Sequence, residues 1–242
     1  MLCLNCRTAL DGAMRFCPQC GQKTSVKRLT LREIAHDAWH ALTHTDHSFL
    51  ALVKALLVRP GTVMREYVEG RRKAYFNPFA FLIVVVGVSS VAMTSSGFGG
   101  FEGSGHPVAR FLQTHLNLLI LAQVPLLALF ARLLFAGSGR NLAEYLVLAA
   151  YASGLRSIFV SLVMVPLTLA LKQAGWGPSY RAQVLIYLLI WAAYFAWVSL
   201  QFHAAAAPRR PVLDAFRGFA VAVLTQLSSS ALIALAFRLV PR

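Results

Sequence analysis

Apolar residues gather in five long stretches that occupy the last two thirds of the chain. Each stretch holds about 20 residues with few charges, which is the length that an α-helix needs to cross a bilayer. We therefore predict an all-α polytopic membrane domain over residues 79–242. The five predicted spans lie near residues 79–96, 114–135, 143–170, 182–203 and 216–238. Segments rich in glycine or proline separate them, as expected for connecting loops.

The first 78 residues are polar and contain all the cysteines of the chain, in two Cys-x2-Cys pairs. The four are Cys3, Cys6, Cys17 and Cys20. This spacing directs four thiolates to one zinc ion and leaves no open coordination position for catalysis. Two disulfides are the alternative, but they need an oxidising compartment, and the chain starts without an apolar signal segment. We predict a structural zinc ribbon over residues 1–24, with one zinc ion per chain that supplies the folding energy.

Residues 25–78 are predicted to form amphipathic helices at the cytoplasmic membrane surface. Thr30 and Glu33 have the capping-box spacing that starts a helix. Histidines then recur four residues apart on one helical face, a spacing that can chelate a second divalent metal. The candidate ligands are His36, His40, His44 and Asp46. A solvated helix face is the alternative interpretation. A metalloprotease is disfavoured, because Asp37 stands where the His-Glu-x-x-His motif has its general-base glutamate.

A basic run, Arg71, Arg72 and Lys73, precedes interfacial aromatic residues and the first predicted span. Such a run is typical of a cytoplasmic membrane entry that contacts anionic lipid head groups. Basic and aromatic residues together also occur in RNA-binding proteins, but about 20 apolar residues follow here at once. We therefore predict contact with lipid and none with nucleic acid.

The chain is 57% hydrophobic and 13% charged, with a formal net charge of +14, which excludes disorder and disfavours an ordinary soluble enzyme. Most of the basic residues lie on one side if the N-terminus is cytoplasmic. Seventeen of the 23 Lys and Arg residues are then inside, five are outside and one lies within a span. The positive-inside rule thus predicts a cytoplasmic N-terminus and an external C-terminus. A reducing cytoplasm agrees with thiolate ligands.

Arg156 is the basic residue within a span, near the middle of the third one. A charge at this depth is costly, so it is either a functional residue or a structural hydrogen-bonding centre. Glu144 is too distant along the same helix to pair with it. We expect Arg156 to contact a polar group such as Gln123 or Gln226 from a neighbouring span.

The order of motifs resembles a family of bacterial membrane proteins catalogued as domain of unknown function 3667. The resemblance rests on Phe16-Cys-Pro-Gln-Cys-Gly-Gln-Lys, Thr43-His-Thr-Asp-His-Ser-Phe, Arg59-Pro-Gly and Arg65-Glu-Tyr-Val-Glu-Gly-Arg-Arg-Lys. It is specific over residues 1–80 and general over the spans. It implies a multi-pass protein of the bacterial inner membrane with a zinc ribbon, and it implies no reaction. It also implies that His40, His44 and Asp46 belong to the family pattern.

Three hypotheses for the function follow. The preferred one is a non-enzymatic scaffold, adaptor or regulator, whose ribbon contacts a protein partner at the cytoplasmic membrane face. The second is a metal-dependent membrane enzyme that uses the histidine face. The third is a transporter or channel subunit that works through Arg156 and requires a homo-oligomer. The sequence contains no Walker loop, dinucleotide-binding glycine pattern or nucleophile elbow, so we assign no catalytic residue.

Overall fold

The computed structural model describes residues 1–31, 33, 48–95, 107–108, 111, 115–175, 180–205 and 210–239. Its regular elements in these ranges are helices, and two isolated β-bridges, Leu2 with Ala9 and Phe16 with Lys23, lie in the N-terminal ribbon. The elements are α2 (Ser48–Val58), α3 (Pro60–Val68), α4 (Pro78–Ser95), α6 (Leu116–Leu134), η1 (Ala136–Ser138), α7 (Leu142–Phe159), η2 (Val160–Met164), α8 (Val165–Gln173), α9 (Tyr180–Phe202) and α10 (Pro211–Leu239). The predicted all-α membrane class is confirmed.

Four helical stretches are long and apolar enough to cross a membrane. They are Asn117–Leu134, Leu142–Leu171, Ala182–Phe202 and Pro211–Leu239, and they match the last four predicted spans. The first predicted span coincides with α4, whose apolar run Pro78–Met93 is shorter, so a fifth span stays a prediction. The π-helical turn η2 joins α7 to α8 without a break, so the third stretch is one continuous helix.

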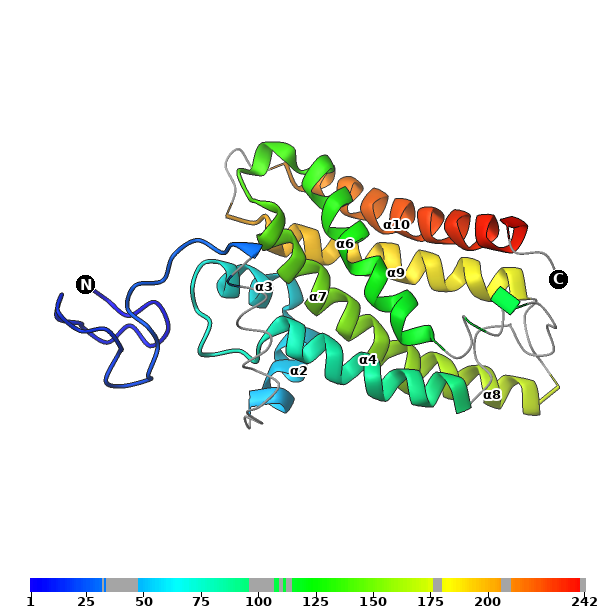
Figure 1. Ribbon diagram of the computed structural model, residues 1–242, viewed down its shortest axis with the longest axis horizontal. Helices are drawn as coiled ribbons and strands as arrows, with labels where there is room; N and C mark the ends of the chain where they lie inside the picture. Colours follow the sequence, from blue (N-terminus) through cyan, green and yellow to red (C-terminus); the bar gives the residue numbers. More distant parts are fainter. Residues whose placement is uncertain are drawn as a thin grey trace.

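The long helices pack side by side, and the ribbon lies at one end of the bundle (Figure 1). The short helices α2 and α3 lie between the ribbon and this bundle, and α4 leads to the opposite end. The chain then returns in α6, leaves again in α7 and α8, returns in α9 and leaves in α10. The described N- and C-terminal segments consequently lie at opposite ends of the molecule.

Local sequence signals explain where several of the helices begin. Helix α3 begins with Pro60, which has no amide hydrogen to leave unpaired at a helix start. Pro211 begins α10 in the same way, five residues before the predicted start of the fifth span. Asn141 and Glu144 form a complete capping box that begins α7. The buried core joins these helices, with Phe81 of α4 and Phe195 of α9 fully enclosed.

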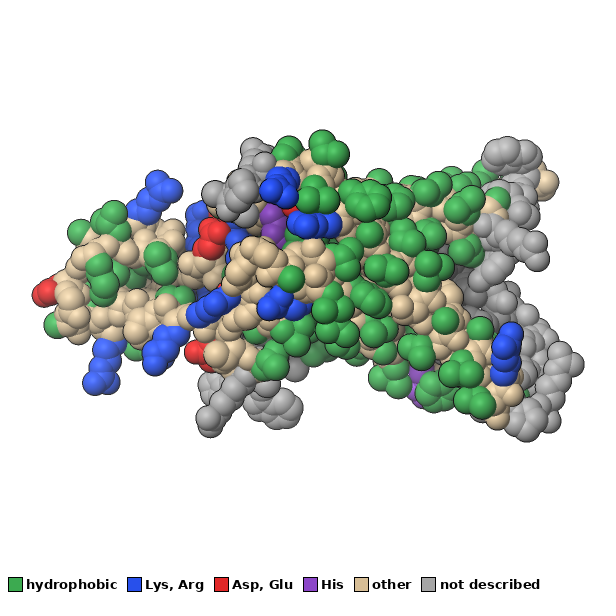
Figure 2. All heavy atoms as spheres, turned by 90° about the horizontal axis from the view of Figure 1, so that it is seen from above, with side chains coloured by type: hydrophobic (Ala, Val, Ile, Leu, Met, Phe, Trp, Pro, Cys, Tyr) green, Lys and Arg blue, Asp and Glu red, His purple; other side chains and the backbone are tan. Residues whose placement is uncertain are grey.

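Large apolar side chains also cover the sides of the helices, where they face outward (Figure 2). Val88, Leu162 and Leu185 are all more than half exposed. An exposed apolar belt of this size indicates contact with lipid rather than with water. In the same view, most of the charged side chains lie on the ribbon and on the end of the helices next to it (Figure 2).

Candidate metal centre and its junction with the helices

Two tight turns hold the four cysteines of the ribbon. In the first, the amide of Arg7 donates to the carbonyl of Cys3, and in the second the amide of Gly21 donates to the carbonyl of Cys17. Arg7 and Gly21 both have positive φ angles, of 61° and 70°. Each residue comes directly after a Cys-x2-Cys pair, so the left-handed conformation closes both turns in the same way.

The four sulfur atoms converge on one point, because they all lie within 4.8 Å of one another. The Sγ atoms of Cys3 and Cys20 are 3.7 Å apart, and those of Cys6 and Cys17 are 3.5 Å apart. Four thiolates around a zinc ion, each about 2.3 Å from it, would be separated by about 3.8 Å. All four residues are free thiols, so the geometry fits a metal ion better than the alternative of two disulfides.

The thiols differ in their surroundings. Hydrogen bonds from Thr8 lower the pKa of Cys6 to about 6, whereas burial raises the pKa of Cys17 to about 11. A metal ion binds thiolates, so its binding must remove a proton from a buried thiol such as Cys17. These ligands could hold a divalent ion in a closed site that stabilises the ribbon and has no open position for a substrate.

The ribbon is attached to the helices through Gln22, two residues after the last cysteine. The side chain is 5% exposed, and its amide donates to the carbonyl of Gly70 over 2.9 Å. Its oxygen accepts from the amide of Lys73 over 3.2 Å. One side chain therefore bonds two backbone groups of the segment between α3 and α4, and it fixes the ribbon against that segment.

Gly70 makes this close contact feasible. Its φ angle is +110°, which disfavours any residue with a side chain. A Cβ atom at this position would lie 2.8 Å from Leu4 and 3.1 Å from Val26. The contact therefore needs glycine both for its backbone conformation and for space.

The segment that receives the ribbon lies within the part of the chain that known proteins share. Residues 46–89 match the family model described as protein of unknown function (DUF3667). The predicted resemblance is confirmed over this segment, which includes α2, α3 and the first part of α4. The ribbon precedes the matched residues, and the description of the family assigns no activity. No curated protein and no solved structure matches the chain.

A polar cluster around Glu66 stiffens the matched segment. Arg59 and Arg71 donate to its two carboxylate oxygens at 3.2 and 3.0 Å, and the hydroxyl of Tyr75 donates to it as well. Partial burial acts to raise the pKa of Glu66, but the hydrogen bond from Tyr75 and the charges of both arginines lower it overall. Burial, together with the Glu66 carboxylate, raises the pKa of Tyr75 to about 12. Arg71 is thus already paired within the protein.

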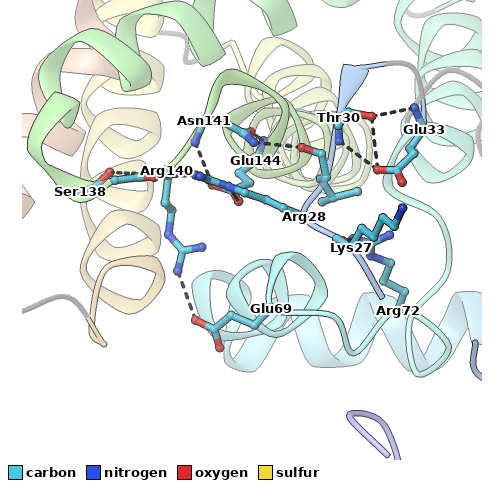
Figure 3. A network of polar contacts seen from close by, with 12 residues as sticks. Lys27, Arg28, Thr30, Glu33, Glu69, Arg72, Ser138, Arg140, Asn141 and Glu144 are labelled. Carbon is cyan, nitrogen blue, oxygen red and sulfur yellow. Dashed lines mark hydrogen bonds and ion pairs between the residues drawn. The ribbon is translucent and has the colours of Figure 1, made fainter. Parts of the chain in front are cut away.

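A second polar network joins the ribbon linker to the start of α7 (Figure 3). Arg28 donates to both oxygens of Glu144, at 2.8 and 3.1 Å, and to the carbonyl of Gly139. Asn141 donates to the carbonyl of Leu29, which enters the main hydrophobic core. The buried carboxylate of Glu144 thus accepts from the backbone amide of Asn141 at the start of α7, and it also binds the linker through Arg28.

A pocket of about 430 Å³ lies within this network. Lys27, Arg28 and Arg140 line it together with Glu69 and His203. Arg140 donates to Glu69 over 3.2 Å, across the pocket from the Arg28 contacts (Figure 3). The network therefore connects the linker, the end of α3 and the α6–α7 connection. Its two carboxylates, Glu69 and Glu144, pair with Arg140 and Arg28.

The other predicted site residues have different outcomes. His36, His40, His44 and Asp46 lie outside the described residues, so the second metal site stays a prediction. The capping contacts between Thr30 and Glu33 are present, with hydrogen bonds of 3.1 and 3.3 Å.

Arg156 is 9% exposed and donates to the Oε1 atom of Gln123 over 2.6 Å. Gln123 is one of the two glutamines that the sequence suggested as a partner. The guanidinium also lies over the Trp191 ring, 4.9 Å from its centroid. The sequence analysis did not predict this contact of Arg156 with Trp191.

Sequence reasoning also missed Gln22 and Arg28 as the residues that attach the ribbon. A signal for Gln22 was present, because it belongs to the Phe16-Cys-Pro-Gln-Cys-Gly-Gln-Lys motif. Nothing local marked Arg28 as the partner of Glu144, which is 116 residues away.

Proposed function

We propose that this multi-pass membrane protein is a non-enzymatic adaptor that presents a zinc-stabilised ribbon at the cytoplasmic face of the bacterial inner membrane. The observation that supports the proposal most directly is the buried Gln22 contact with Gly70 and Lys73. A ribbon on a flexible tether would need no such contact. Fixed against the helices, the ribbon offers its outer surface to a partner in a constant orientation.

The outer surface of the ribbon has the composition of a protein-binding site. Leu2, Met14 and Phe16 are 66, 41 and 61% exposed, although the ribbon core is only Cys3, Leu10 and Cys17. Covering such exposed apolar side chains with another protein surface is favourable, because it removes them from water. We infer that a protein partner contacts this surface.

The proposed orientation rests on charge. Residues 1–78 contain 12 of the 23 Lys and Arg residues, and the positive-inside rule favours a cytoplasmic location for such a region. In the predicted lipid-binding run, Arg71 donates to Glu66 and Arg72 donates to the carbonyl of Lys27. Lys73 is therefore the member of this run with the fewest described side-chain contacts. Anionic lipid head groups would approach this surface from the membrane.

The test compares the proteins that purify with four chains extracted from membranes: the wild type and three variants. We expect the wild type to retain a partner that Phe16→Ser and Cys17→Ser both lose. Leu50→Ser is the control, because Leu50 of α2 is 78% exposed outside the ribbon. An unchanged set of proteins in all four samples, or no retained partner with the wild type, would contradict the proposal.

A further inference from the structure

Arg156 has no carboxylate partner among the described residues. Only Glu144 and Asp214 are acidic between residues 107 and 242. Glu144 pairs with Arg28, and Asp214 lies 3.9 Å from Arg217. A buried guanidinium within a membrane-spanning bundle is costly without a counter-charge. The requirement for a negative group at Arg156 is therefore not met by these residues.

Near Arg156, polar groups that can donate hydrogen bonds lack acceptors among the described residues. Its described hydrogen bond goes to Gln123, and its guanidinium lies over Trp191. Trp191 is 3% exposed, and its Nε1 has no hydrogen-bond acceptor among the residues that the structure describes. Within the described part of the chain, the buried hydroxyl of Tyr194 also lacks a hydrogen-bond partner. The Tyr194 ring stacks on Trp191, with 5.6 Å between the ring centroids. A ligand that supplies acceptor atoms would satisfy these groups.

The helix that contains Arg156 is irregular at this level. The π-helical turn η2, Val160–Met164, begins four residues after Arg156, and the amide of Val160 donates to the Arg156 carbonyl. Ser161, within the turn, has a buried hydroxyl for which the described ranges contain no hydrogen-bond partner. Single π-helical turns interrupt α-helices frequently at functional sites.

An apolar pocket of about 460 Å³ adjoins this group. Gln123 of α6 lines it, and its walls include Leu119, Leu126 and Phe111 on one side and Ile233 of α10 on the other. Because Gln123 also accepts the hydrogen bond from Arg156, one side chain connects the charge with the pocket. The pocket therefore has apolar walls next to a polar, positively charged group.

We propose that Arg156, Gln123 and Trp191 bind the carboxylate of an amphipathic, fatty-acid-type molecule whose hydrocarbon chain occupies this pocket. The carboxylate supplies the negative charge and the acceptor atoms that the described residues lack. The chain matches the apolar walls, and the volume is typical of small-molecule pockets. The inference is independent of the adaptor function, because it concerns the middle of the membrane and not the ribbon.

The test uses contact quenching of Trp191 fluorescence by bromine. Trp39, Trp176 and Trp197 are replaced by Phe, and the protein is placed in nanodiscs of phosphatidylcholine. Dibromostearate is titrated, with its methyl ester as the control for partition into the bilayer. We expect saturable quenching by the acid and a weaker, non-saturating effect of the ester. Sodium iodide is titrated separately to detect a site for small anions.

Two variants separate binding from folding. Arg156→Gln removes the charge, and Gln123→Glu supplies an internal carboxylate that pairs with Arg156 while the protein stays folded. Both should weaken binding of the acid roughly tenfold or more. Arg238→Gln, which removes an exposed charge at the end of α10, should leave it unchanged.

Equal quenching by acid and ester, or equal affinities in wild type and Gln123→Glu, would overturn the proposal. Saturable quenching by iodide without any by the acid would overturn it too, since it would indicate a small-anion site.

Discussion

Gln22 provides a direct measure of how firmly the ribbon is attached. Replacing it with alanine removes a buried side chain and both of its hydrogen bonds. The Lys73 amide then loses its described partner, whereas the Gly70 carbonyl keeps the hydrogen bond from the Arg72 amide. Each hydrogen bond contributes about 1 kcal/mol net, and an unsatisfied buried group costs about 1–3 kcal/mol. We therefore expect Gln22→Ala to weaken the attachment by about 2–3 kcal/mol, which is roughly a hundredfold change in its equilibrium.

The Lys73 amide is the natural reporter, because its described hydrogen bond goes to Gln22. Hydrogen exchange followed by mass spectrometry on the protein in detergent should show faster exchange in the segment that contains Gly70 and Lys73. Exchange from locally opened states follows the opening equilibrium, so the rate should rise by the same factor. The cores of the long helices should exchange as in the wild type.

Gln19→Ala is the matched control, since Gln19 is an exposed glutamine in the same ribbon. It removes the same side chain without touching the helices, and we expect no change at Lys73. The reasoning would be refuted if Gln22→Ala left exchange at Lys73 unchanged, or if both variants accelerated it equally.

Three further predictions concern the metal, the junction and pH. Purified protein should contain one zinc ion per chain and lose it in Cys17→Ser; a second ion that disappears in His40→Ala would establish the histidine site. Arg28→Ala should lower the free energy of unfolding, because the buried Glu144 loses its charged partner. In a double-mutant cycle, zero coupling to Glu144→Gln would contradict that contact. Since Glu66 has a lowered pKa in the folded state, its contribution is present above the unfolded pKa of about 4.3 and is lost as the pH falls. Melting temperatures measured between about pH 5 and pH 3 should fall less in Glu66→Gln than in the wild type.

The sequence predicted those features that neighbouring residues determine. The lengths of the apolar stretches identified the helices near residues 116–134 and 180–202, because crossing a bilayer requires about 20 apolar residues. The spacing of Cys3, Cys6, Cys17 and Cys20 likewise predicted their convergence, since each pair lies in one tight turn.

Contacts between distant segments could not be predicted in this way. Gln22 and Gly70 are 48 residues apart, and Arg28 and Glu144 are 116 apart. In the sequence, Glu144 was a lone acid at the start of a span, and Arg28 was one of many basic residues. The choice among many basic partners depends on how the helices pack, which the pattern of apolar residues does not specify.

The contacts of Gln22 connect the metal centre to the surface of the helices. The ribbon core consists of Cys3, Leu10 and Cys17, which is too little apolar surface to fold a module of this size without a metal. Gln22 is held in place by its own carbonyl, which accepts from the Cys17 amide over 2.8 Å in the second cysteine turn. Loss of the metal would loosen this turn, and with it both contacts of the Gln22 side chain. A chelator should therefore accelerate exchange at Lys73 in the wild type and have little further effect in Gln22→Ala. Additive effects of chelator and substitution would show instead that the ribbon and the helices are stabilised separately.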